Sequence, residues 1–130
     1  MNEFLDKKTY VKQAENVIGK LKRDKFKNAI AVSYSQLRNI LALMNELYNA
    51  VLYSSDEKLN DDMQSRIQYV KMKIVYAAGR DINMNVKDFV TCSNILNYMD
   101  MIGDSRERLM LVCHYMESLI AYHKFMGGKD

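Results

Sequence analysis

The chain of 130 residues contains no proline and no tryptophan, and it has only five glycines and two cysteines. Proline concentrates in loops, at strand edges and in first helical turns, so its absence, with so few glycines, favours long helices joined by short connections. The composition, 48% hydrophobic and 27% charged, is that of an ordinary globular protein and excludes wholesale disorder. We therefore expect a single domain over residues 1–130.

Long apolar runs and paired cysteines are also missing. The longest apolar runs, such as residues 74–78, hold about five residues, whereas a membrane-spanning helix needs roughly 18. No charged-then-apolar leader opens the chain. Cys92 and Cys113 lie 21 residues apart, and neither has a neighbouring cysteine that would suggest a metal knuckle. The expectation is a cytoplasmic protein with reduced thiols and no membrane attachment.

Apolar residues recur at three- and four-residue spacing in five stretches, and this spacing places them on one face of a helix. The stretches cover residues 10–21, 33–53, 54–78, 86–101 and 105–126. No strand-like alternation or internal repeat competes with this pattern. The sequence therefore predicts an all-α fold, a compact bundle of about five helices.

Capping residues predict where the second and third helices begin. Ser33 or Ser35 can cap the second, and Ser54 with Ser55, followed by two acidic residues, predicts the start of the third. Gly79 is the predicted stop of that third helix.

The last two predicted helices carry weaker boundary signals. A break is expected within residues 86–101, near Ser93 and Asn94. Asp104 with Glu107 predicts an acidic version of the capping box at the start of the last helix.

Positive charge is concentrated near the N-terminus. The whole chain has 19 Lys and Arg against 16 Asp and Glu, a net charge of +3. Residues 1–34 alone have eight against four, and residues 20–27 (KLKRDKFK) hold five cations and one aspartate. Because Lys and Arg favour helix C-terminal ends, we expect a basic helix end and loop near residues 20–34.

Groups that could support catalysis do not converge. His114 and His123 are nine residues apart on one predicted helix, so they point to opposite faces and cannot share a metal ion. Cys113 and His114 are adjacent, and neighbours on a helix diverge. The acidic run at residues 56–62 lacks the glycine and the final glutamate of a calcium loop. We predict no catalytic residue, no cofactor and no metal site, and hence no enzyme.

A basic row with nearby tyrosines is the strongest candidate binding surface. Arg66, Lys73 and Arg80 are seven residues apart and share one edge of the third helix, with Tyr69 and Tyr76 further round. These cations could pair with phosphates and the tyrosines could stack on bases. The competing interpretation is a solvated face with tyrosines at a core rim.

Other helices add further candidates to this surface. They are Arg38, Arg106, Lys124, Tyr115 and Tyr122. Met72 and Val75 point away from the buried stripe of the third helix, and such outward apolar residues suit protein–protein contact instead.

Three blocks in order resemble one known family. Residues 115–130 (YMESLIAYHKFMGGKD), 35–41 (SQLRNIL) and 69–81 (YVKMKIVYAAGRD) resemble the small helical subunit of the type III-A (Csm) CRISPR effector complex, and residues 86–89 agree as well. The blocks span roughly residues 33–130. Departures are Tyr34 and Ser118, where Thr and Ala are more usual, and the first 30 residues match only in being basic and helical.

The resemblance implies a non-catalytic role in antiviral defence. In that family, copies of the small subunit stack as a filament beside the backbone subunits that carry the guide RNA. They contact the large subunit and help to hold the target RNA paired to the guide. Exchange of identical helices would also allow the isolated protein to form a homodimer.

We therefore predict an RNA-binding surface and keep one alternative. The predicted RNA contacts are Arg38, Arg66, Lys73, Arg80 and Lys124. Arg80, immediately after Gly79, could instead pair with a carboxylate and hold the helix end. The alternative function is a purely protein–protein scaffold without significant RNA contact, which joins its partner subunits or itself.

Overall fold

The computed structural model describes residues 3–130, so the first two residues of the predicted domain lie outside the described part. Within it the chain forms six helices: α1 (Tyr10–Lys20), α2 (Tyr34–Val51), α3 (Asp61–Arg80), α4 (Asn85–Ser93), α5 (Ile95–Asp100) and α6 (Arg106–Phe125). No strand is assigned among these residues, which confirms the all-α prediction. The count is six rather than about five because the predicted helix over 86–101 is two helices.

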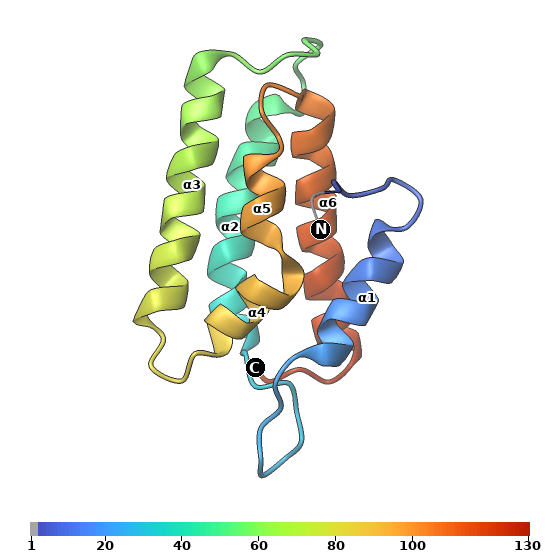
Figure 1. The fold of residues 1–130 in the computed structure, drawn as a ribbon, viewed down its shortest axis with the longest axis vertical. Coiled ribbons are helices and arrows are strands. Elements are labelled where there is room, and N and C mark those ends of the chain that lie inside the picture. The colour runs from blue at the N-terminus through green and yellow to red at the C-terminus, as the bar shows by residue number, and fades with distance from the viewer. Residues whose placement is uncertain (1–2) are drawn as a thin grey trace.

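The three long helices run side by side along the long axis of the molecule (Figure 1). α6 packs against α1 on one side and α2 on the other, and α3 packs against α2, α4 and α5. The buried apolar side chains of all six helices form one cluster. α3 therefore lies at an edge of the structure and leaves a broad face to solvent.

The separation of α4 from α5 is built into the core. Asn94 has a φ of 61°, in the left-handed region that Asn tolerates better than most residues, and this ends α4 at Ser93. The freed carbonyl oxygen of Ser93 accepts a hydrogen bond of 2.8 Å from the hydroxyl of the fully buried Tyr115. Burial raises the pKa of Tyr115, so this hydroxyl stays a donor. The predicted break is confirmed.

Two helix starts differ from prediction. α2 begins as expected, because Ser33 and Gln36 form a complete capping box. α3, however, begins at Asp61, capped by Asn60, and not near Ser54. The intervening chain is pinned elsewhere, since the Leu59 N–H donates to the carbonyl of Asp104 at 2.7 Å.

The remaining boundary errors have similar local causes. α3 runs through Gly79 to Arg80. Gly79 lies inside the helix and its φ is not positive, so it does not end α3. α6 is capped by Ser105, whose hydroxyl accepts from the Arg108 N–H, rather than by Asp104.

The basic segment after α1 is an ordered hairpin, which we call the 22–30 hairpin. Arg23 and Ile30 pair in antiparallel fashion, and the Asp24 N–H donates to the Ala29 carbonyl at 2.7 Å. Asn28 takes a left-handed φ of 55° at the turn. Figure 1 shows this segment projecting beyond the ends of the helices, close to the C-terminus.

The C-terminal tail closes the same end of the molecule. The Lys129 N–H donates to the Ile30 carbonyl at 3.3 Å, and the Tyr34 N–H donates to the Lys129 carbonyl at 2.7 Å. His123 is fully buried beneath this tail, with its Nε2 2.8 Å from the Val32 carbonyl oxygen. Gly128 lies directly against the His123 ring. The tail thereby joins α6 to the hairpin and to the first turn of α2.

The contact between Gly128 and His123 predicts a stability effect. A Cβ at position 128 would overlap the imidazole ring of His123, so Gly128→Ala must displace a buried ring or the tail. We expect a loss of about 1–3 kcal/mol in the free energy of unfolding, measured by urea denaturation followed by circular dichroism.

Gly79→Ala is the matched control for this substitution. Nothing lies within 4 Å of a Cβ at position 79, and alanine is the better helix former, so this variant should gain about 0.5–1 kcal/mol. Equal stability of Gly128→Ala and the wild type would contradict the tail contact.

Candidate nucleic-acid interface

The exposed face of α3 carries the predicted basic row. The Asn60 side chain accepts from the Met63 N–H at 2.8 Å and fixes the start of the helix, while two aspartates in the first turn suit its positive end. One side of the helix is buried through Met63, Ile67, Val70, Ile74 and Ala78. Arg66, Lys73 and Arg80 are all exposed and, at seven-residue spacing, lie in one row.

Two of these cations are paired with tyrosine rings. The Nζ of Lys73 lies 5.0 Å from the centroid of the Tyr69 ring, and the Cζ of Arg80 lies 5.9 Å from the centroid of the Tyr76 ring. The two rings are 56% and 67% exposed, so each keeps much of its surface open. The pairs repeat after two helical turns, about 10 Å along the axis. A strand of nucleic acid crossing this face would meet a cation and a flat ring twice in succession.

The ends of the basic row open into two shallow hollows. One, of about 460 Å³, lies beside Arg80 between the first turns of α2 and the α3–α4 connection, and is lined by the polar side chains of Gln36, Asn39, Asp81 and Asn83. The other, of about 200 Å³, holds Arg66 with Asp56 and Asp62. Lys58 lines the same hollow as Arg66, and Lys73 lies between the two hollows in sequence.

The other two predicted contacts lie on different helices. Arg38 is exposed on the outer face of α2, because it lies about 200° round the helix from the buried Ile40. Lys124 is in the last turn of α6, and its Nζ is 3.9 Å from an Asp130 carboxylate oxygen. The structure therefore places Arg66, Lys73 and Arg80 in one row on α3, while Arg38 lies on α2 and Lys124 on α6.

Several further candidate residues have structural roles instead. Tyr115, named as a further candidate for stacking on bases, is fully buried, and that prediction is wrong for this residue. Tyr122 is half-buried, with its ring edge-on to Phe125. Arg106 donates to the carbonyls of Val51 and Leu52 at the end of α2, so its guanidinium is already engaged.

The residue that sequence reasoning missed is Phe26. It stands in the basic hairpin between Lys25 and Lys27 and is 96% exposed. The sequence does contain a signal for it, because an aromatic residue within a run of cations suits nucleic-acid binding. The prediction for residues 20–27 considered only their charges.

The histidines do not form a shared site. His123 is buried against Val32, while the Nδ1 of His114 lies 3.1 Å from a Glu117 oxygen at the surface. Within residues 3–130, no group of three or more His, Cys, Asp or Glu side chains is placed to hold a metal ion. Across the same residues, no helix is long and apolar enough to cross a membrane.

Fold and surface together define a small all-helical protein with a row of cations and aromatic rings along one exposed helix. Comparison with known proteins then identifies the family. Residues 5–129 match the family model described as Csm2 Type III-A.

Similar curated proteins carry one common name, "CRISPR system Cms protein Csm2". That of Streptococcus thermophilus is 39% identical over 127 residues, which is 98% of each chain. That of Mycobacterium tuberculosis (strain ATCC 25618 / H37Rv) is 37% identical over 121 residues, 93% of this chain and 94% of the relative. The chain belongs to the Csm2 family of type III-A CRISPR systems, which confirms the resemblance seen in the sequence.

The two cysteines give a prediction about reactivity. Burial raises the pKa of the Cys113 thiol to about 12, with a smaller contribution from Glu117. Burial and the nearby Asp88 also raise the pKa of Cys92, which is only half-buried. Because the thiolate is the reactive form, iodoacetamide at pH 8 should alkylate Cys92 slowly and Cys113 only after unfolding, as read by peptide mass spectrometry.

Alkylation of Cys113 in the native protein at the rate of Cys92 would contradict its burial. Denatured protein provides the control, because both thiols should then react alike.

Proposed function

We propose that this chain is the non-catalytic small subunit of a type III-A CRISPR ribonucleoprotein effector complex, located in the cytoplasm. It acts there as one compact helical bundle. In this proposal, copies of it stack as a filament beside the backbone subunits that carry the guide RNA, contact the large subunit, and help to hold the target RNA. Membership of the Csm2 family supports the assignment to this complex.

The observation that carries the RNA contact is the pairing of Lys73 with Tyr69 and of Arg80 with Tyr76. In a guided complex, base pairing supplies the sequence recognition, so the protein needs to contact only backbone and shape. Exposed cations at regular spacing meet that requirement, and a guanidinium such as Arg80 can contact a phosphate with two parallel hydrogen bonds. No base-reading set of side chains is required.

Each copy presents only a short basic row, so binding by one subunit is weak. Arg66 and Lys58 share one hollow with the carboxylates of Asp56 and Asp62, so the charges there balance. Several copies held in line would act together, because the first contact raises the effective concentration for the next. Affinity for target RNA thus arises in the assembled complex.

The test replaces Lys73 and Arg80 together by Gln. Target RNA affinity of the assembled complex should fall about three- to thirty-fold, since each exposed ion pair contributes up to about 1 kcal/mol. The slope of log affinity against log salt should fall by about 0.7 to 0.9 for each phosphate that the variant no longer neutralises. Filter binding over a salt series measures both quantities. Adding Arg38→Gln tests whether the outer face of α2 contributes.

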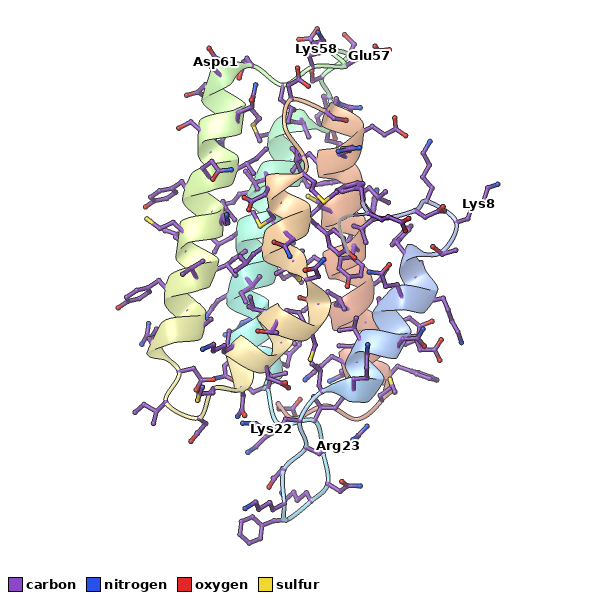
Figure 2. The ribbon with its side chains drawn as sticks, in the orientation of Figure 1. Lys8, Lys22, Arg23, Glu57, Lys58 and Asp61 are labelled. Atoms are coloured by element: carbon purple, nitrogen blue, oxygen red, sulfur yellow. The ribbon has the colours of Figure 1, made fainter. Side chains whose placement is uncertain are left out.

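Lys8→Gln combined with Lys12→Gln is the matched control. It removes the same charge from exposed positions, and Figure 2 places Lys8 on the side of the molecule away from α3. Unchanged affinity and an unchanged salt slope for the α3 variant, with assembly intact, would overturn the RNA contact.

A second candidate function is a purely protein–protein scaffold, favoured by two exposed apolar residues on α3. Met72 is 54% exposed and Val75 49% exposed, and both face away from the core. If this face serves only assembly, replacing both by Gln should abolish co-sedimentation with partner subunits. RNA affinity would then follow assembly alone. Val11→Gln, at an exposed position of α1, is the control, and normal assembly of the α3 double variant would contradict this candidate.

A further inference from the structure

From the 22–30 hairpin, we propose a second RNA contact, separate from α3, in which Phe26 stacks on an unpaired base and Lys25 and Lys27 bind the flanking phosphates. This inference rests on the proposed contact with RNA but uses a different surface. Figure 2 shows Lys22 and Arg23 at the base of this projecting segment. The three sequence blocks named above begin at residue 35, and the hairpin lies within residues 5–129 that match the family model.

The hairpin is a rigid support rather than a loose loop. The Phe26 N–H donates to an Asp24 carboxylate oxygen at 3.0 Å, and the Arg23 guanidinium donates to the Asn28 carbonyl at 3.0 Å. The Asn28 N–H donates to the Asp24 carbonyl at 2.9 Å. These bonds hold the backbone of the tip in one shape, so a ring at the tip is presented at little cost in conformational entropy.

The base of the hairpin is anchored to the rest of the fold. The Lys22 N–H donates to an Asp88 carboxylate oxygen at 2.8 Å, and the Lys22 Nζ donates to the Asn83 carbonyl at 2.9 Å. From the other side, the Lys129 N–H bonds the Ile30 carbonyl, and the Lys129 Nζ lies 3.9 Å from an Asp24 oxygen. The tip therefore moves with the body of the protein.

The charges at the tip are distributed in favour of an anionic ligand. The single acidic residue, Asp24, is occupied by the Phe26 N–H and approached by Lys129. Lys22 and Arg23 serve the hairpin itself, while neither Lys25 nor Lys27 has an ion-pair partner among residues 3–130. The tip thus offers two free ammonium groups on either side of one open ring.

This chemistry suits a nucleic acid better than a protein surface. The core of a protein interface is contiguous, apolar and depleted in lysine, whereas Phe26 is a lone ring between two lysines. A base offers a flat π face and carries a phosphate on each side, which matches a ring flanked by cations. Stacking requires a base outside a duplex, so the ligand class is single-stranded RNA.

The experiment compares Phe26→Ala and Phe26→Trp in the full-length protein. The probe is a short single-stranded RNA with one 2-aminopurine, whose fluorescence falls on stacking. Wild type and Phe26→Trp should quench the probe. Phe26→Ala should lose the quenching and bind about 5- to 160-fold more weakly, which is the range that one stacked base supplies. A duplex of the same sequence should show no dependence on Phe26.

Tyr53→Ala is the matched control, because Tyr53 is 93% exposed just beyond the far end of α2. Both side chains are almost fully exposed, so neither variant should change the unfolding midpoint. The Lys73 and Arg80 variant should retain the quenching, which separates failure of this inference from failure of the α3 contact.

Three results would overturn the proposal. One is equal binding and equal quenching by Phe26→Ala and wild type. Another is the absence of any binding of the single-stranded probe by wild type at low salt. The third is loss of self-association in Phe26→Ala with RNA binding intact, because the hairpin would then contact a second copy of the chain.

Discussion

The burial of α6 between α1 and α2 is the constraint on which the other elements depend. Its buried side chains run from Leu109 to His123, nearly the whole length of the helix, and Tyr115 and His123 among them make hydrogen bonds to distant backbone carbonyls. Tyr115 bonds the carbonyl that the α4–α5 break sets free, and His123 bonds the Val32 carbonyl ahead of α2. One helix therefore fixes a break in the chain at one point and the entry to α2 at another. α3 takes no part in these bonds and is free to present a surface.

Periodicity and capping residues predicted most of this fold. The wrong predictions arise where contacts between residues distant in sequence decide the structure. Ser33 caps α2 as expected because its partner Gln36 is local in sequence. Ser54 has every local feature of a cap, yet the chain continues to Asn60, because Leu59 is buried and its N–H pairs with Asp104 in a distant turn. The ordered hairpin at 22–30 could not be predicted either. Its shape depends on Asp88 and on the C-terminal tail, which only folding brings close.

The candidate surface was likewise predictable only where it depends on local sequence. The row of Arg66, Lys73 and Arg80 follows from helical geometry alone. The exposure of Tyr69 and Tyr76 does not, because the sequence left open that these rings close a core rim. Positions on other helices could not be related to that row, since their rotation about α2 and α6 depends on packing. The proposed surface has two parts of different origin. One is the side of a long helix, and the other is a short hairpin braced by the tail.

The position of the tail sets the order in which the core can close. The backbone of residue 129 bonds both Ile30 and Tyr34, and α6 packs between α1 and α2. These contacts join segments that lie far apart along the chain, so a large loop must close before they can form. Helices α3, α4 and α5 are neighbours in sequence and pack on one another, so they can associate sooner. We therefore expect the docking of α6 and the tail to be the slow step of folding.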